Sequence, residues 1–139
     1  MMRIVKVLIL LVTLSIVGFY SYSERIKINS HYSAVFYNRA WNCRGKCSLQ
    51  KQKWYYDKAI YHDPGFADAY FRLGAMVEDE GDIQRALPFY RKAAALDFKH
   101  HEAHYKVGLQ YYRAHDYERA LRHLLVSEQI GRASCRERV

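Results

Sequence analysis

The sequence predicts an all-α protein built as a stack of helix–turn–helix repeats and preceded by an apolar N-terminal helix. The first observation is a period of 34 residues between segment 67–100 and the chain that follows it. Self-similarity at this period is typical of stacked repeats rather than of one globular core. The second observation is composition: half of the residues are hydrophobic and only two are proline, which excludes a disordered chain. Paired positions are Leu73 with Val107, Gly74 with Gly108, Val77 with Tyr111, Asp82 with Asp116, and Ala86 with Ala120.

These residues resemble the tetratricopeptide repeat pattern. Leu73-Gly74 and Val107-Gly108 stand at its Leu-Gly pair, and Ala86 and Ala120 stand at the first alanine of its second helix. The resemblance covers 67–128 and, with more departures, 33–66. It implies a right-handed, all-helical superhelix that binds other proteins, with no catalysis and no cofactor of its own.

The N-terminal segment 1–23 has the layout of a signal peptide or a membrane anchor. Arg3 and Lys6 precede fourteen uncharged, mostly aliphatic residues at 7–20, and Ser23 is a candidate cleavage position. Cleavage and retention as an anchor are both open alternatives. Either one places the repeats on the extracytoplasmic side, in a membrane-anchored, secreted or periplasmic protein. Residues 24–32 are predicted to form a polar linker.

Three repeats are predicted, at 33–66, 67–100 and 101–129. The first is divergent, as expected for a terminal repeat, and Asp63-Pro64 ends its second helix because the residue before proline avoids helical geometry. In the second repeat, Gly81 is expected to adopt positive φ and Asp82 to cap the next helix. His115 takes the place of this glycine in the third repeat.

Residues 130–139 are predicted to be a non-native tail. They can be encoded by a nucleotide string that resembles a common sequencing adapter, so the third repeat is expected to be truncated and the natural chain to continue. The alternative is an ordinary basic helical tail. Cys135 carries no meaning if the tail is non-native.

The family resemblance implies that the first helix of each repeat lines a concave groove. An aromatic stripe at helical spacing can instead be core, and this alternative stays open. An aromatic groove edged with cations suits a peptide with apolar anchors and an acidic group. The carboxylate clamp that some family members use is absent. The predicted peptide-binding residues are Tyr37, Trp41, Phe71, Arg72, Tyr105, Lys106, Leu109 and Tyr112.

Cysteines and histidines offer other candidate sites. Cys43 and Cys47 are predicted to close a small disulfide loop, with free thiols as the alternative. His100 and His104 are one helical turn apart, but no third ligand is evident, so no metal site is predicted. Residues 78–80 are interpreted as a solvated acidic run.

The predicted function is a protein–protein interaction scaffold, not an enzyme. One alternative is that the repeats form the N-terminal part of a longer enzyme, such as a transferase, and another is a self-associating structural repeat protein. The net charge of +8 is spread along the chain, so nucleic acid is not a predicted partner. The expected partners are a protein or peptide, and the membrane if the N-terminal segment is retained.

Overall fold

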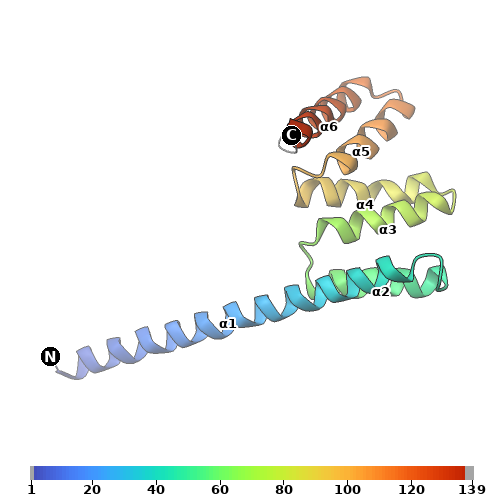
Figure 1. Ribbon diagram of the computed structural model, residues 1–139. Coiled ribbons are helices and arrows are strands. Elements are labelled where there is room, and N and C mark those ends of the chain that lie inside the picture. The colour runs from blue at the N-terminus through green and yellow to red at the C-terminus, as the bar shows by residue number, and fades with distance from the viewer. Residues whose placement is uncertain (1, 137–139) are drawn as a thin grey trace.

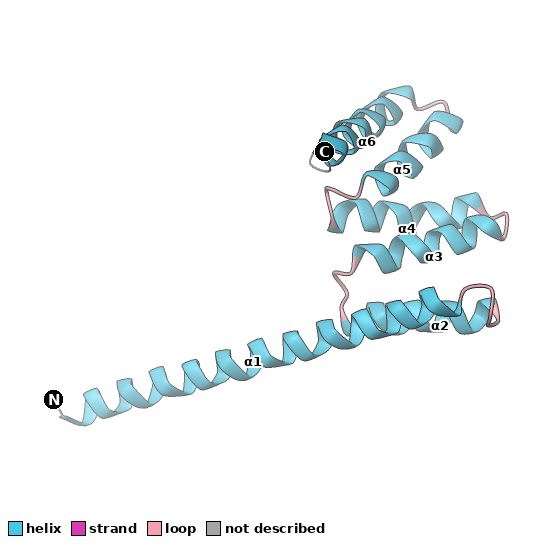
Figure 2. Ribbon diagram, viewed as in Figure 1, coloured by secondary structure: helices cyan, strands magenta, loops and turns pink. Residues whose placement is uncertain are grey.

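A computed structural model describes the backbone of residues 2–136 and the side chains of residues 12–27 and 29–133. Helices account for nearly all of this part, and it contains no strand (Figure 2). The all-α prediction is therefore confirmed. The helices are α1 (Met2–Cys43), α2 (Leu49–His62), α3 (Ala67–Asp79), α4 (Ile83–Leu96), α5 (His101–Arg113) and α6 (Tyr117–Arg136).

The helices pack as successive antiparallel pairs (Figure 1). The C-terminal part of α1 pairs with α2, α3 with α4, and α5 with α6, and each pair stacks on the next. The N-terminal part of α1 projects away from this stack, so that the N-terminus lies far from the repeats. Each repeat buries its apolar side against its neighbours, as a one-dimensional array requires.

The turns within the repeats have the conformations that the sequence predicts. Gly81 and His115 both adopt positive φ, at 89° and 61°. Asp82 then caps α4 by accepting a hydrogen bond from the Arg85 amide at 2.9 Å. A side-chain oxygen at this position satisfies a backbone N–H group that has no partner within the helix.

Close helix packing explains the small residues of the second repeat. Gly74 lies on α3 against α4, where a β-carbon would stand only 2.9 Å from the Tyr90 ring. Tyr90 itself is fully buried, as are Ala86 and Ala93 on the same helix. This cluster continues into the third repeat through Val107, while a second cluster around Tyr56 joins the first repeat to the second.

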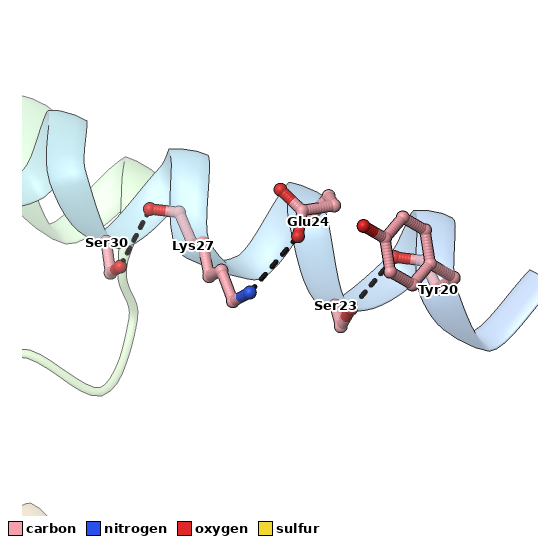
Figure 3. A network of polar contacts seen from close by, with 5 residues as sticks. All are labelled: Tyr20, Ser23, Glu24, Lys27 and Ser30. Carbon is pink, nitrogen blue, oxygen red and sulfur yellow. Dashed lines mark hydrogen bonds and ion pairs between the residues drawn. The ribbon is translucent and has the colours of Figure 1, made fainter.

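Residues 24–32, expected as a linker, are helical and continuous with the first helix of the first repeat. Figure 3 shows this stretch of α1, where Ser23 and Ser30 donate hydrogen bonds to the carbonyls of Tyr20 and Lys27, at 2.8 and 2.9 Å. Lys27 pairs with Glu24 at 3.1 Å across one helical turn. A serine inside a helix can satisfy its hydroxyl in this way, by donating to a backbone carbonyl of the preceding turn.

Within the described part of the chain, no helix combines the length and the apolar content that crossing a bilayer requires. Cleavage or anchoring of 1–23 stays a prediction.

The backbone of residues 130–136 continues α6. The origin of 130–139 as a translated adapter stays a prediction. Cys135 lies outside the described side chains, and 137–139 lie outside the described residues.

Candidate peptide-binding site

The predicted groove residues come from α1, α3 and α5, the first helices of the three repeats. The structure divides them into three groups. Tyr37 and Phe71 pack inward, whereas Trp41, Tyr105 and Tyr112 are exposed. The other members, Arg72, Lys106 and Leu109, are half-buried.

Phe71 corrects the expectation that all members of the set line an open groove. Its side chain is only 7% exposed and belongs to the core between the second and third repeats. Its ring lies 5.4 Å from the Tyr90 ring and 4.7 Å from the His100 ring, measured between centroids. Phe71 is therefore a core residue, and a ligand can reach at most its rim.

Tyr37 has a similar role in the first repeat. Its ring centroid lies 5.6 Å from that of Tyr56 and 5.0 Å from that of Phe66. These contacts connect α1 to α2 and to the loop before α3. The fifth position of the first helix thus contributes to packing in two of the three repeats, and only Tyr105 is half exposed there.

Trp41 is the centre of a cation–aromatic layer between the first and second repeats. The Arg44 guanidinium lies 4.3 Å from its ring centroid and that of Arg72 lies 4.5 Å from it. The indole nevertheless remains 39% exposed. Arginine over an aromatic ring is favourable, and it fixes the guanidinium in a defined plane.

Arg72 retains unused hydrogen-bonding capacity in this layer. Its Nε is buried and has no hydrogen-bond partner within the described residues. A buried donor without an acceptor costs free energy, about 1–3 kcal/mol. A guanidinium can bind both oxygens of a carboxylate, which makes Arg72 a candidate anchor for an acidic group.

A pocket of about 360 Å³ adjoins this layer. It is formed by the α1–α2 loop, α2 and α3, and its lining includes cations, carboxylates and apolar groups. Such a mixed surface can hold a side chain with an apolar body and a charged end. The lining includes Arg44, Tyr56, Arg72, Met76 and Asp79.

Glu78 corrects the interpretation of 78–80 as a solvated run. Its carboxylate accepts hydrogen bonds from Tyr90 at 2.5 Å and from Lys106 at 2.7 Å. Burial alone would raise the pKa of Glu78, but the hydrogen bonds from Lys106 and Tyr90, together with the positive charges of Lys106 and Arg113, outweigh burial and lower the pKa. Glu80 in turn pairs with Lys53 at 2.6 Å, so two of the three acidic residues join helices.

Sequence reasoning missed Glu78 and Arg44 as members of this region. Both occupy the twelfth position of their repeats, the position that yielded Tyr112 in the third repeat. That register was the available signal. It was obscured because Glu78 stands in an acidic triplet and Arg44 stands beside the cysteines.

Lys106 is consequently not a free cation. Its ammonium group is held by Glu78 and lies 5.8 Å from the Tyr90 ring centroid. Further along α5, Tyr112 is 57% exposed. Its ring meets the ring of Tyr117, on α6, edge-on with 5.7 Å between centroids. Of the predicted groove residues in the third repeat, the exposed ones are therefore tyrosines.

Cys43 and Cys47 form a disulfide with a Cα–Cα distance of 5.4 Å. The bond closes the turn after α1, where Gly45 adopts a φ of 75°. Cys47 also lines the pocket beside Arg72. The disulfide therefore constrains a loop that forms part of the candidate site. That the two cysteines are oxidised in solution stays a prediction.

His100 and His104 face different partners although they are one turn apart. His100 caps α5 by accepting from the Ala103 amide, and its Nε2 lies 3.3 Å from Asp68. The nearby His100 side chain lowers the pKa of Asp68. Within the described residues, no group of three or more His, Cys, Asp or Glu side chains is arranged to hold a metal ion.

Solved structures of similar fold include two proteins of low sequence identity. The second tetratricopeptide repeat domain of Spaghetti (RPAP3), bound to the HSP90 peptide SRMEEVD, has a TM-score of 0.68 at 12% identity, covering 81% of this chain and 97% of that one. MamA has a TM-score of 0.63 at 18% identity, covering 78% of this chain and 63% of MamA. A second MamA structure, MamA MSR-1 C2, has a TM-score of 0.50 at 17% identity, covering 78% of this chain and 59% of that one.

The chain thus spans less than two thirds of the length of the MamA chains. No protein-family model matches the sequence. The structural likeness shows a tetratricopeptide-repeat-like fold.

Proposed function

We propose that this chain is a protein-interaction scaffold that binds a peptide segment of another protein beside the Trp41–Arg72 layer. The observation that carries the proposal is Arg72, whose buried Nε has no acceptor among the described residues and whose guanidinium lies on the partly exposed Trp41 ring. The neighbouring pocket supplies the space for one anchoring side chain. The peptide would offer an aromatic or aliphatic anchor and a carboxylate.

Exposed tyrosines extend this surface along the stack. Tyr105 and Tyr112 lie on α5, two helix pairs away from Trp41, and both are at least half exposed. Tyrosine and tryptophan contribute large contact areas at low entropic cost, which makes them frequent anchors of peptide recognition. A peptide that spans both ends would contact all three repeats.

Selection of binding peptides by the purified chain tests this proposal. A displayed peptide library identifies ligands, and fluorescence anisotropy then measures their dissociation constants. Trp41→Ala and Arg72→Gln are each expected to weaken binding at least about tenfold, which corresponds to about 1.4 kcal/mol. Binding to Arg72 is also expected to weaken with added salt, because the contact is between charges.

Matched controls are available on α2, at exposed aromatic residues that do not line the pocket. Trp54 is 49% exposed and Tyr61 is 76% exposed, and both lie on α2 away from the layer. Trp54→Ala and Tyr61→Ala should leave affinity unchanged. Equal losses in Trp54→Ala and Trp41→Ala, with both variants folded, would place the binding surface elsewhere.

The peptide SRMEEVD provides a second test. The carboxylate clamp is absent from this sequence, and Lys106, the cation of the third repeat in this set, is held by Glu78. SRMEEVD should therefore bind no tighter than a scrambled peptide of the same composition. Preferential binding of the native order would show that these repeats read the peptide's terminus in another way.

A further inference from the structure

A pair of histidines joins α5 to α6 at a place that the proposed peptide site does not use. The Nδ1 atoms of His104 and His123 are 3.2 Å apart, and their ring centroids are 5.4 Å apart. His104 is only 6% exposed, and its Nε2 is buried without a hydrogen-bond partner among the described residues. The Tyr111 ring stacks on His123 at 5.7 Å.

The proton count of this pair determines what it can donate. Two neutral imidazoles joined through their Nδ1 atoms share one N–H···N hydrogen bond, which leaves one proton for the two Nε2 atoms. One further proton from solvent makes both Nε2 atoms donors and gives the pair a charge of +1. The Nε2 atom of His123 is then a hydrogen-bond donor, whichever tautomer the neutral pair had adopted.

The pair opens onto a pocket of about 580 Å³ between α4, α5 and α6. α5 packs against both α4 and α6, and all three helices contribute lining residues to this pocket. Cations line the α4 side, and no carboxylate belongs to the lining that the described residues provide. The lining residues are Pro88, Arg91, Lys92, Ala94, Ala95, His104, Tyr111 and His123.

Charged groups of both signs surround the pair, with arginines near His123 and an aspartate near His104. Arg122 on α6 and Arg91 on α4 both act on His123, while His100 and Asp97, in the loop before α5, act on His104. Burial lowers the pKa of both rings, and His104 and the two arginines lower that of His123 further. At His104 burial outweighs the Phe98 backbone and Asp97, which would raise the pKa. The empty pair is thus neutral near pH 7, and an anion beside it would favour its protonation.

We propose that the pocket between α4, α5 and α6 binds an oxoanion of the phosphate type, and that the His104–His123 pair takes up one proton as it does so. Arg91 supplies a planar fork that matches an oxoanion, and Lys92 supplies a second charge. A divalent metal ion fits this site poorly, because the pair has no third ligand among the described residues and the surrounding cations repel it. The site shares no residue with the groove set.

Sulfate is the appropriate first probe because its charge stays constant between pH 5 and 8. Isothermal titration at matched ionic strength should show sulfate binding more tightly as pH falls, by about tenfold per pH unit where the free pair is neutral and the bound pair is protonated. Repeating the titration in buffers of different ionisation heat should report the uptake of about one proton.

Single substitutions assign the effect to the pocket. His123→Gln should abolish the pH dependence of sulfate binding, and Arg91→Gln should weaken binding about tenfold or more at every pH. The matched controls are His101→Gln and Arg85→Gln, which change exposed residues outside the pocket lining. Sulfate binding no tighter than chloride binding, or equal losses in Arg85→Gln and Arg91→Gln, would overturn the proposal.

The source of the oxoanion is decided by competition. Inorganic phosphate and a peptide carrying O-phosphoserine are compared with the unphosphorylated peptide as control. Tighter binding of the phosphopeptide assigns the pocket to a modified side chain of a partner. Tighter binding of inorganic phosphate assigns it to the free ion. Failure of both, with Trp41-dependent peptide binding intact, would reject this site and leave the proposed function standing.

Discussion

At the scale of single residues, the repeats depend on a few positions where two helices approach too closely for an ordinary side chain. Gly74 meets the Tyr90 ring and the Phe89 β-carbon, and Gly108 meets the Leu124 side chain. Tyr90 and Ala120 complete these contacts without exposing apolar surface. The repeat pattern thus places small residues where two helices approach closely.

Gly74→Ala is expected to destabilise the chain although alanine is the better helix former. Its β-carbon would lie 2.9 Å from Tyr90 and 3.1 Å from Phe89, and forced overpacking costs about 1–3 kcal/mol. Thermal or urea unfolding measures the change. Gly18→Ala on α1 is the control. No atom of the part of the chain that the structure describes lies within 4 Å of its added β-carbon, so stability should be unchanged or rise by up to about 1 kcal/mol.

The buried histidines predict a loss of stability in mild acid. Burial lowers the pKa of His104 and His123, so the unfolded chain binds more protons than the folded chain below about pH 6.5. Stability should therefore fall as pH drops from about 6.5 towards 5. Asp68 and Glu78, whose pKa values are also lowered, contribute a separate loss below about pH 4.

Urea unfolding at several pH values, in a buffer without oxoanions, measures this dependence. His123→Gln should flatten the part between pH 5 and 6.5, whereas His101→Gln, on an exposed residue, should not. An unchanged slope in His123→Gln would mean that the pair is already protonated in the folded protein.

At the scale of elements, Glu78 connects three helices. It belongs to α3, Tyr90 to α4 and Lys106 to α5, so one carboxylate joins the second repeat to the third. Loss of a charge-assisted hydrogen bond with a half-buried partner left behind costs about 1–3 kcal/mol. Neighbouring repeats share their interface energy, so the cooperativity of unfolding depends on such contacts.

Glu78→Gln should lower the free energy of unfolding by about 1–3 kcal/mol and broaden the unfolding transition. Glu24→Gln on α1 is the matched control, since Glu24 makes a single exposed ion pair, whose contribution is typically below about 1 kcal/mol. Equal effects of the two changes would show that the Glu78 contacts add nothing to the interface.

The disulfide predicts a measurable but modest stabilisation. Cys43 and Cys47 are four residues apart, and closing so small a loop is worth about 2 kcal/mol in the chain-entropy model. Reductant should lower the urea midpoint of the native chain and leave that of a Cys43→Ser, Cys47→Ser double variant unchanged. An identical midpoint with and without reductant would indicate free thiols.

How far the elements follow from the sequence depends on how local their signals are. Gly81, Asp82, Asp63-Pro64 and His115 act within one turn of the chain, and the helix ends they predict match the structure. The continuity of α1 through 24–32 was not predicted, because polar composition there was interpreted as a linker although the stretch contains no glycine or proline.

The candidate site was harder to predict for a different reason. Assigning Phe71 to the groove relied on its register in the repeat, but His100, the last residue of the same repeat and the N-cap of α5, packs against its ring. Likewise the His104–His123 contact joins residues 19 apart, which no local pattern reports. Register predicts the helix face, and only the neighbouring helix decides whether that face is open.

At the scale of the whole molecule, the stack and the projecting part of α1 are separate in their energetics. Side chains at 12–20 are exposed. Further along α1, Tyr22 lines a pocket shared with the end of α2, and the Tyr32 ring contacts His62 of α2. Removing residues 1–20 should leave the melting temperature within about 2 °C of the intact chain, because little packing is lost. A large fall in the melting temperature would reveal that this segment folds back on the repeats.

The helical continuity of α1 also fixes how the repeats are rotated about the axis of this helix. A helix of 42 residues is about 63 Å long, and each residue turns it by about 100°. Whatever holds its far end therefore fixes the direction in which the Trp41–Arg72 surface points, as well as its distance. One residue inserted at 24–32 would swing that surface about a quarter of a turn, and seven would bring it nearly back into phase.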